Sequence, residues 1–468
     1  MEYDYIIIGA GPSGLTASYY LGKLGKKVLL IDKNNSIGGC HRVMRVNGLF
    51  SEHSPRFYSN SYSNFKNLLL NFGTSFETLF TPMKFNSYSV FKNSIFNLKI
   101  RELILFTVDF IKLIVNKNHG KNTTMETYVL NNHFNKNSIK FINNVCRLTD
   151  GADITRYTLS QFLQIANQQL IHTLYQPKEP TDTKLFNIWL DNIINTNNVN
   201  IKLNTEIQKI NFNNNTITNI EINNTIVSAK NYILALPPVA LENILNNSNI
   251  SNAFLSSNFN TWVNQNKYDN HISICFHWNT KINLQNIWMI PKSDWGLAYI
   301  VLSDYMYFND SRSITVISIT LTNTTSKSSI TNKIASKSSK EEIINEAFRQ
   351  LKETFINLPE PTFIIFNPKL KFINGKWIED DSAFINTVGN SFIKSKSWCF
   401  NNLYNLGTQN GNSTYHFTSI ESAISNAISL VHTLEPETKK TIPLLETDTL
   451  IDIIKFLFIV MFILEIFR

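Results

Sequence analysis

Three glycines near the N-terminus have the spacing needed to hold a diphosphate. Residues 5–14 read Tyr-Ile-Ile-Ile-Gly-Ala-Gly-Pro-Ser-Gly, an apolar run that ends in the pattern Gly-x-Gly-x-x-Gly. Gly9 permits a tight turn, Gly11 lets the backbone approach the diphosphate, and Gly14 lets the next helix pack closely against the preceding strand. Free N–H groups and the dipole at the start of a helix favour an anion there. The pattern therefore predicts a dinucleotide site.

A β-α-β unit is expected to position these glycines. Apolar residues at helical spacing predict a helix over residues 13–24, and the run Val-Leu-Leu-Ile at 28–31 predicts a second strand that ends at Asp32. Asp32 lies eighteen residues after Gly14, where a carboxylate accepts hydrogen bonds from an adenosine ribose and favours a free 2′-hydroxyl. This context favours nucleotide binding over an ordinary strand-to-helix turn.

The composition excludes several other classes of protein. The 468 residues are 43% apolar and 12% aromatic, which is ordinary for a globular chain of two or three domains. The net charge is +8, but the lysines are scattered and form no stripe, so no nucleic-acid partner is expected. The four cysteines have no Cys-x-x-Cys spacing, so we expect neither a disulfide framework nor a metal site.

The C-terminal segment is strongly apolar. Residues 450–467 contain only three charged side chains, Asp452, Lys455 and Glu465, and the segment is just long enough to span a bilayer. We therefore expect residues 448–468 to form a membrane-anchor helix, with the catalytic part attached to the membrane and facing the cytosol. The alternatives are a terminal helix packed on the protein and a helix that lies in the membrane interface.

Periodic patterns divide the rest of the chain into helical and strand-rich parts. Helices are expected over residues 98–115, 125–134, 138–146, 159–174, 185–195 and 341–355. Strands are expected over residues 199–203, 206–210, 216–222, 231–238, 272–278, 297–302, 314–321 and 362–372.

A second strand-to-helix crossing lies near the C-terminus. The strand-like run at 402–407 is followed by a polar loop and by a helix over residues 419–431. Small side chains on this helix, among them Ser422 and Ala423, let a backbone approach a flat ligand closely. Two helix N-termini from opposite ends of the chain are thus expected to converge on one cofactor.

With these features the chain resembles the flavin-dependent amine oxidase superfamily, which includes monoamine and polyamine oxidases, protoporphyrinogen oxidase and the phytoene desaturase group. The resemblance covers residues 1–75, 199–240 and 400–431 well. It implies an α/β fold: a Rossmann-type FAD-binding domain of three layers in the order ββα, an inserted α+β substrate domain and a C-terminal hydrophobic helix. The implied bounds are 1–85, 196–245 and 373–435 for the FAD-binding domain, 86–195 and 246–372 for the substrate domain, and 448–468 for the anchor.

Further motifs of the superfamily have counterparts here, with departures. A Gly-Gly-Arg turn that touches the FAD diphosphate corresponds to residues 38–40, where Cys40 stands in place of Arg, and Arg42 or Arg56 is expected to substitute. Residues 52–56, Glu-His-Ser-Pro-Arg, resemble the acid-x-Gly-Pro turn beneath the flavin, with Ser in place of Gly. Residues 407–409, Gly-Thr-Gln, resemble a Gly-Thr-Glu turn beside the ribityl chain.

The resemblance also distinguishes subgroups of the superfamily. Ser419 stands where monoamine oxidases carry a cage tyrosine, and residues 418–421 look more like the Thr-Met-Glu version of isoprenoid desaturases. The covalent-flavin cysteine is missing, which implies non-covalent FAD. The resemblance assigns to the cofactor Gly9, Gly11, Pro12, Ser13, Gly14, Asp32, Lys33, Gly38, Gly39, Cys40, His41, Arg42, Arg56, Ile207, Gly407, Thr408, Gln409, Ser419, Ile420 and Glu421.

In this superfamily the flavin removes a hydride equivalent while the protein holds the substrate against it. His271 stands roughly where amine oxidases place a flavin-proximal Lys, and His53 lies in the flavin-side turn, so both are candidate catalytic residues. A hydrogen-bonded histidine at a strand end is the alternative for His271. Aromatic residues either line an apolar pocket or fill the core; the candidates are Trp262, Trp288, Trp295 and Tyr299.

The sequence thus predicts an FAD-dependent oxidoreductase, an oxidase or dehydrogenase. Its expected substrate is a small amine or an apolar isoprenoid-like or porphyrin-like molecule, oxidised at a C–N or C–C bond, with O2 or a quinone-like acceptor. One alternative is a non-catalytic binding protein that resembles Rab GDP-dissociation inhibitors. Another is a redox-neutral flavin mutase, although the Arg-rich clamp that a sugar nucleotide needs is not evident.

Overall fold

Five parallel strands form the sheet that carries the dinucleotide motif. The computed structural model describes residues 2–84, 97–256, 259–266, 271–284, 293–379 and 392–466. The strand order is β19-β12-β1-β2-β8, and the crossing from β1 to β2 runs through helix α1. The strands are β1 (Tyr3–Ile8), β2 (Val28–Ile31), β8 (Val199–Lys202), β12 (Ala229–Leu234) and β19 (Leu403–Asn405).

The two faces of this sheet are covered by different layers. Tyr5 and Ile7 of β1 pack with α1 (Pro12–Lys23) and α13 (Ile420–Leu434), whereas Ile6 and Ile8 pack against an antiparallel meander. This alternation follows from the two-residue period of a strand that is buried on both faces. The predicted Rossmann-like α/β architecture is confirmed. The meander is β9 (Ile207–Asn213), β10 (Thr216–Ile222) and β11 (Thr225–Val227).

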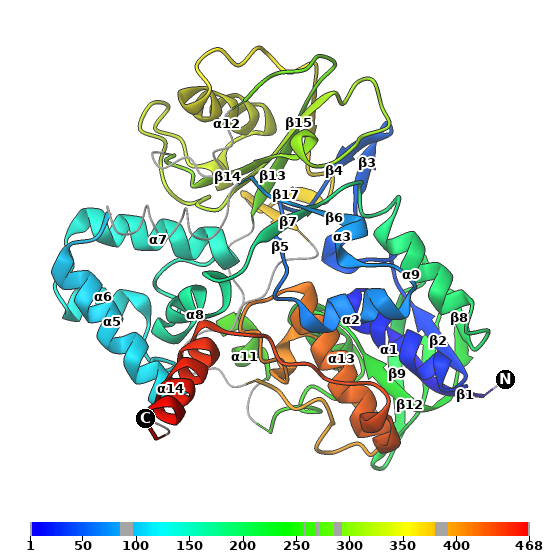
Figure 1. Ribbon diagram of the computed structural model, residues 1–468. Coiled ribbons are helices and arrows are strands. Elements are labelled where there is room, and N and C mark those ends of the chain that lie inside the picture. The colour runs from blue at the N-terminus through cyan, green and yellow to red at the C-terminus, as the bar shows by residue number, and fades with distance from the viewer. Residues whose placement is uncertain are drawn as a thin grey trace.

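A second, antiparallel sheet lies at the top of Figure 1. Its order is β14-β15-β13-β16, and α12 (Lys340–Thr354) packs on one face through a core that includes Ile343 and Leu351. The hairpin β3-β4 packs on the other face through Leu49 and Phe50. The elements are β3 (Met44–Val46), β4 (Leu49–Ser51), β13 (Ile272–Trp278), β14 (Leu297–Val301), β15 (Thr315–Leu321) and β16 (Phe363–Phe366).

Four helices form a separate group at the left of Figure 1. Phe106, Tyr128, Phe134 and Phe162 pack together between them, with Phe106 within 5.5 Å (ring centroids) of each of the others. The helices are α5 (Ile100–Val115), α6 (Met125–Asn131), α7 (Lys136–Asp150) and α8 (Leu159–Gln169).

Several predicted elements begin or end at other residues in the structure, and the two largest differences concern residues 159–174 and 362–372. The helix expected over 159–174 ends at Gln169, and β7 begins at Leu174 because this segment pairs with β5 and β6. The strand expected over 362–372 is divided into β16 and β17. The remaining elements are β5 (Tyr58–Ser59), β6 (Phe80–Pro82), β7 (Leu174–Pro177), β17 (Leu370–Ile373), β18 (Lys376–Glu379), α2 (Ser63–Asn71), α3 (Phe76–Leu79), α9 (Leu185–Ile194), α10 (Pro238–Asn247) and α11 (Phe259–Asn266).

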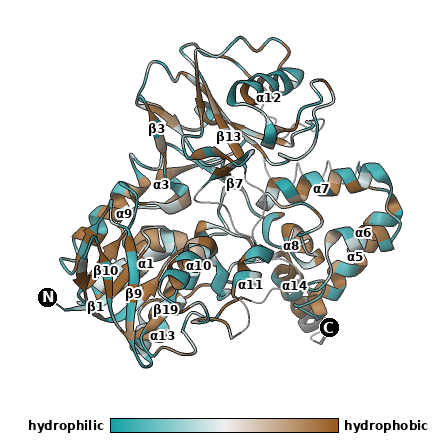
Figure 2. Cartoon of the chain, turned by 180° about the vertical axis from the view of Figure 1, so that it is seen from behind, coloured by the Kyte–Doolittle hydropathy of each residue, from teal (hydrophilic) through white to brown (hydrophobic). Residues whose placement is uncertain are grey.

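The C-terminal helix α14 (Leu450–Ile466) packs on the protein with its first turn. Ile451 is buried, and its backbone N–H donates a 2.9 Å hydrogen bond to Asn167 of α8. Figure 2 shows α14 as a hydrophobic ribbon beside α5 and α8. In the part of the chain that the structure describes, no helix has the length and apolarity needed to cross a bilayer. The transmembrane anchor predicted from the sequence is therefore not supported.

Candidate functional site

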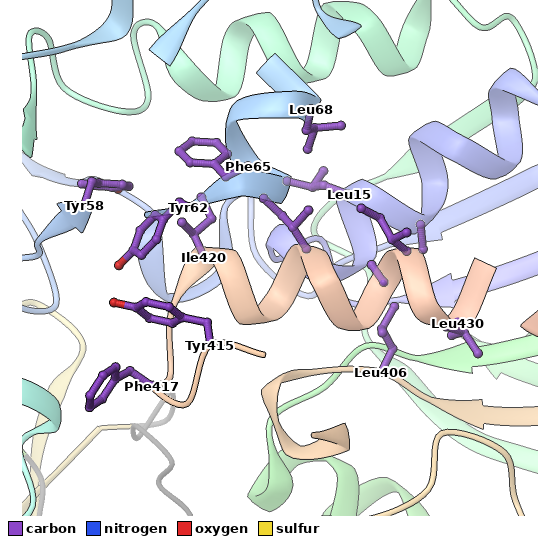
Figure 3. Close-up of a cluster of buried hydrophobic side chains, with 14 of the residues drawn as sticks. Leu15, Tyr58, Tyr62, Phe65, Leu68, Leu406, Tyr415, Phe417, Ile420 and Leu430 are labelled. Atoms are coloured by element: carbon purple, nitrogen blue, oxygen red, sulfur yellow. The ribbon is translucent and has the colours of Figure 1, made fainter. Parts of the chain in front are cut away.

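A cavity of about 1080 Å³ is lined by both of the helix N-termini that the sequence predicts to converge. Pro12 and Ser13 at the start of α1 line it, and so do Ser419 and Ile420 at the start of α13. The two helices lie side by side against the same face of the parallel sheet. Figure 3 shows aromatic rings, including Tyr62, gathered at the N-terminal end of α13. The predicted convergence of the two crossings on one space is present in the structure.

The motif glycines divide into two roles. A Cβ on Gly14 would lie 1.9 Å from the carbonyl oxygen of Gly9, and a Cβ on Gly9 would lie 2.2 Å from that of Ala235. Gly9 also has a φ of +108°, which favours glycine. A Cβ on Gly11 would meet only the Cα of Gly39, at 3.7 Å. Gly9 and Gly14 therefore allow the backbone to pack, whereas Gly11 keeps the cavity open.

Asp32 is held at the end of β2 by backbone and side-chain donors. Its Oδ2 accepts a 2.8 Å bond from the N–H of Ala10, and its Oδ1 accepts bonds of 2.8 and 2.9 Å from the backbone and side-chain nitrogens of Asn34. Arg42 lies 3.6 Å away. Both Asp32 and Lys33 line the cavity. The carboxylate is thus fixed beside the space where a ribose would bind.

The turn after Asp32 also borders the cavity. Gly38 and Gly39 have φ values of 111° and 55°, so glycine is suited to both positions. Arg56 donates to the carbonyl oxygen of Cys40, which holds its guanidinium beside this turn. Gly39, Cys40, His41, Arg42 and Arg56 line the cavity, whereas Gly38 does not.

His41, in the same turn, has a strongly lowered pKa. Burial, together with the positive charge of Arg56, holds the pKa of the His41 ring well below its ordinary value. Its Nδ1 atom lies 3.2 Å from the hydroxyl oxygen of Tyr58. A neutral imidazole is therefore expected there at physiological pH.

The segments from the middle and end of the chain complete the wall. Ile207 lines the cavity at the start of β9, and the turn of Gly407, Thr408 and Gln409 lines it after β19. The Gln409 amide donates a 3.1 Å bond to the carbonyl of Leu236. A Cβ on Gly407 would lie 2.1 Å from Gln409 Oε1, so a larger residue there would displace the Gln409 amide from its present position.

Gly14 and Glu421, like Gly38, are predicted cofactor residues that do not line the cavity. Glu421 turns toward α2, where its carboxylate accepts hydrogen bonds from the backbone N–H groups of Asn64 and Phe65 at 3.0 and 2.9 Å. Ser419 instead caps α13 by accepting a bond from the N–H of Ser422. The structure thus gives the start of α13 both a cavity-facing side and a packing side.

The two candidate catalytic histidines lie close together in the wall of the cavity. Their ring centroids lie 6.5 Å apart, and both rings line the cavity. His53 Nδ1 lies 2.8 Å from the carboxylate of Glu379, which is itself buried. His271 Nε2 lies 3.5 Å from the carbonyl oxygen of Gly151, and burial lowers the pKa of His271 to about 4. His271 is therefore neutral near pH 7.

The rest of the cavity wall is mainly apolar. It comes from α5, α7, α8 and the inner face of α14, which contributes Leu450, Ile454 and Phe458 at four-residue spacing. Of the aromatic candidates, Tyr299 lines the cavity, whereas Trp262 and Trp295 are buried elsewhere in the core. Trp288 lies outside the described residues.

Sequence reasoning missed Glu379, because a single acid at the end of a short hairpin carries no local signal. It also missed the apolar wall of α5, which appears in the sequence only as an amphipathic helix.

Comparison with known proteins supports the N-terminal unit directly. A family described as an NAD(P)-binding Rossmann-like domain matches residues 7–72. Curated thiamine thiazole synthases match over 39 residues, at 56% identity for Pyrococcus horikoshii and 54% for Saccharolobus islandicus. The match covers 8% of this chain and only 16% and 15% of these relatives, so it concerns a short segment.

Solved structures match over nearly the whole chain. Wild-type putrescine oxidase bound to putrescine is 12% identical, with a TM-score of 0.62 and coverage of 93% of this chain and 99% of that one. Cyclohexylamine oxidase from Brevibacterium oxydans is 12% identical, with a TM-score of 0.61 and coverage of 93% and 100%. A protoporphyrinogen oxidase-like protein from Exiguobacterium is 12% identical, with a TM-score of 0.59 and coverage of 92% and 98%. At these identities the likeness shows a shared fold.

Proposed function

We propose, from the premise that this chain has the fold of the flavin-dependent amine oxidase superfamily, that it is an FAD-dependent oxidoreductase. This proposal depends on one observation. The N-termini of α1 and α13, Asp32 and the turn at Gly407 all border the same cavity. A dinucleotide needs a helix start for its diphosphate and a carboxylate for its ribose, and the cavity offers both.

The residues present fit FAD. The first turn of α1 has no side-chain cap at Gly11, so its N–H groups are available to a diphosphate. Asp32 would hold the ribose, and Arg42 and Arg56 would offset the negative charge. The departure at Ser54 costs no backbone strain, since this residue does not have a positive φ. No cysteine lies between Gly407 and Tyr415, in agreement with non-covalent binding.

When bound, FAD supplies the oxidant, which accepts a hydride from the substrate. The chain supplies orientation and a water-poor site. The wall from α5, α8 and α14 is mainly apolar, while His53, His271 and Tyr299 add polar side chains to the wall. This arrangement supports a substrate with an apolar body and one polar group, oxidised at a C–N or C–C bond. An amine fits this description best.

The visible spectrum of the purified full-length chain tests the proposal. The full chain is needed because α14 forms part of the cavity wall. We expect a yellow protein that bleaches with dithionite and releases FAD on denaturation. Recovery of the colour in air would favour an oxidase over a dehydrogenase with a quinone-like acceptor. A colourless protein that takes up no added FAD would refute the proposal and favour a binding protein of the GDP-dissociation-inhibitor type.

A further inference from the structure

Three residues in or just after different strands form a chain of close polar contacts that ends at the cavity. Asn367 follows β16, Glu379 ends β18, and His53 follows β4. Asn367 Nδ2 donates a 3.0 Å bond to Glu379 Oε1, and Glu379 Oε2 lies 2.8 Å from His53 Nδ1. All three side chains are buried.

In each contact of this chain, the neighbouring contact determines which atom carries the hydrogen. The backbone N–H of Lys369 donates a 2.9 Å bond to Asn367 Oδ1, so the amide nitrogen of Asn367 must face Glu379. Glu379 is a carboxylate acceptor: burial opposes its charge, but hydrogen bonds from His53 and Asn367 outweigh burial and lower its pKa. Nδ1 of His53 lies 2.8 Å from this carboxylate oxygen and must carry a hydrogen, because two lone pairs at that distance would repel each other. In the neutral ring the lone pair is then on Nε2.

Nε2 of His53 is the atom left for a ligand. His53 lines the cavity, and within the described residues Nε2 has no hydrogen-bond partner. Tyr299 and Thr320 also line the cavity, and their hydroxyl groups are buried without a partner among the described residues. The neighbouring His271 ring faces the carbonyl of Gly151 instead. His53 is thus the histidine here that faces a carboxylate through Nδ1 and keeps Nε2 as an acceptor.

We propose that Glu379 and Asn367 position His53 as the proton acceptor of the oxidation, with Nε2 facing the substrate. This inference rests on the proposed function. For a primary amine, the hydrogen on the carbon next to the nitrogen leaves as hydride to the oxidised flavin, which gains two electrons. One N–H proton goes to Nε2 of His53, and the electron pair of that N–H bond becomes the second carbon–nitrogen bond of the imine product. The carboxylate of Glu379 stabilises the imidazolium that forms.

The variant Glu379→Gln tests whether Glu379 positions His53, because it changes the hydrogen on the ring and keeps the shape of the side chain. The Gln oxygen stays paired with Asn367, because the amide of Asn367 cannot turn without losing Lys369. The new amide nitrogen then faces His53 and donates to Nδ1, which moves the ring hydrogen to Nε2. The shape of the side chain is unchanged, but the acceptor at the cavity is lost.

The experiment uses the FAD-loaded full-length protein with 15N-labelled histidine at alkaline pH, with His53→Gln to assign the signals. We expect a pyridine-like signal at Nε2 of His53 in the wild type and at Nδ1 in Glu379→Gln. The rate of anaerobic flavin bleaching by cyclohexylamine or putrescine should fall about 100-fold or more in this variant. Glu360→Gln is the matched control, since the Glu360 carboxylate is exposed and pairs only with Lys352 among the described residues; both readouts should stay at wild-type values.

Three outcomes would overturn the inference while leaving the proposed function intact. The first is a wild-type ring with its hydrogen on Nε2. The second is a Glu379→Gln ring with the reversed tautomer but an unchanged bleaching rate. The third is a yellow holoprotein that neither amine reduces. A protein that binds no FAD would instead refute the proposed function itself.

Discussion

The carboxylate of Glu421 caps α2 through Asn64, which is 357 positions earlier in the chain. Glu421 Oε1 accepts bonds of 3.0 and 2.7 Å from the backbone and side-chain nitrogens of Asn64, and Oε2 accepts the N–H of Phe65. Burial, only partly offset by these bonds, raises the pKa of Glu421. This contact joins α13 to α2 and so fixes the helix start that borders the cavity.

Replacing Glu421 with Ala should destabilise the protein. The change leaves the backbone N–H groups of Asn64 and Phe65 buried without an acceptor, at an expected cost of about 2–4 kcal/mol in the free energy of unfolding. Because the side chain does not line the cavity, the folded fraction should keep its FAD. Urea unfolding and the ratio of flavin to protein absorbance measure the two effects.

Glu341→Ala is the matched control for this prediction. Glu341 also lies in the first turn of a helix, α12, but its side chain is exposed. Its loss should change the free energy of unfolding by about 0.5 kcal/mol or less. If Glu421→Ala instead kept wild-type stability and lost its flavin, the residue would have the cofactor role that the family resemblance implies.

Two alanine substitutions in the glycine motif should fail in different ways. Gly14→Ala places a methyl group 1.9 Å from a backbone oxygen, so the α1–β1 packing must shift and we expect poor folding. Gly11 has an ordinary φ of −76° and no atom closer than 3.7 Å to an added Cβ, so Gly11→Ala should fold. The methyl group would then occupy the space of the diphosphate and weaken FAD binding.

Circular dichroism and FAD titration separate these two effects. Gly11→Ala should have a wild-type spectrum and at least about a tenfold weaker affinity for FAD, which is about 1.4 kcal/mol. Equal FAD affinity in Gly11→Ala and the wild type would contradict a diphosphate at this turn.

Asp32→Ala should weaken FAD retention without unfolding the chain. A hydrogen bond to a charged group is worth about 1.5–3 kcal/mol, so we expect roughly a 10- to 100-fold loss of affinity. Flavin fluorescence during titration of the apoprotein gives the measurement. Asp191→Ala, on the exposed side of α9, should bind FAD like the wild type. Unchanged affinity in Asp32→Ala would rule out the ribose contact.

The sequence predicted the parts of the site that depend on local rules. The turn at Gly9, the strand that ends at Asp32 and the second crossing at Gly407 follow from neighbours in the chain, and the structure brings them to one cavity. The contacts of Glu421 with Asn64 and of Glu379 with His53 join residues hundreds of positions apart. No periodicity or spacing encodes such pairs.

The C-terminal segment is a second case in which the sequence did not predict contacts between distant residues. Its apolar composition predicted a helix, and α14 is one, but composition does not show where a helix packs. The hydrogen bond from Ile451 to Asn167 and the lining role of Ile454 depend on α8, which is encoded almost three hundred residues earlier.

A half-buried acid just after β4, Glu52, should make stability fall as pH rises. Burial raises the pKa of Glu52 to about 7, and its Oε1 atom has no hydrogen-bond partner among the described residues. The folded state therefore favours the protonated form. The stabilisation that this form provides is complete below the ordinary carboxyl pKa of 4.5 and is lost as pH rises through about 7.

Glu52→Gln removes this titration and keeps the shape of the side chain. Other titrating groups are common to both proteins, so the difference in unfolding free energy between them isolates Glu52. From about pH 5 to pH 8 the wild type should lose on the order of 2–3 kcal/mol relative to Glu52→Gln, as measured by urea unfolding of the FAD-saturated proteins. Parallel pH profiles for the two proteins would show that the Glu52 carboxyl group ionises normally in the folded chain.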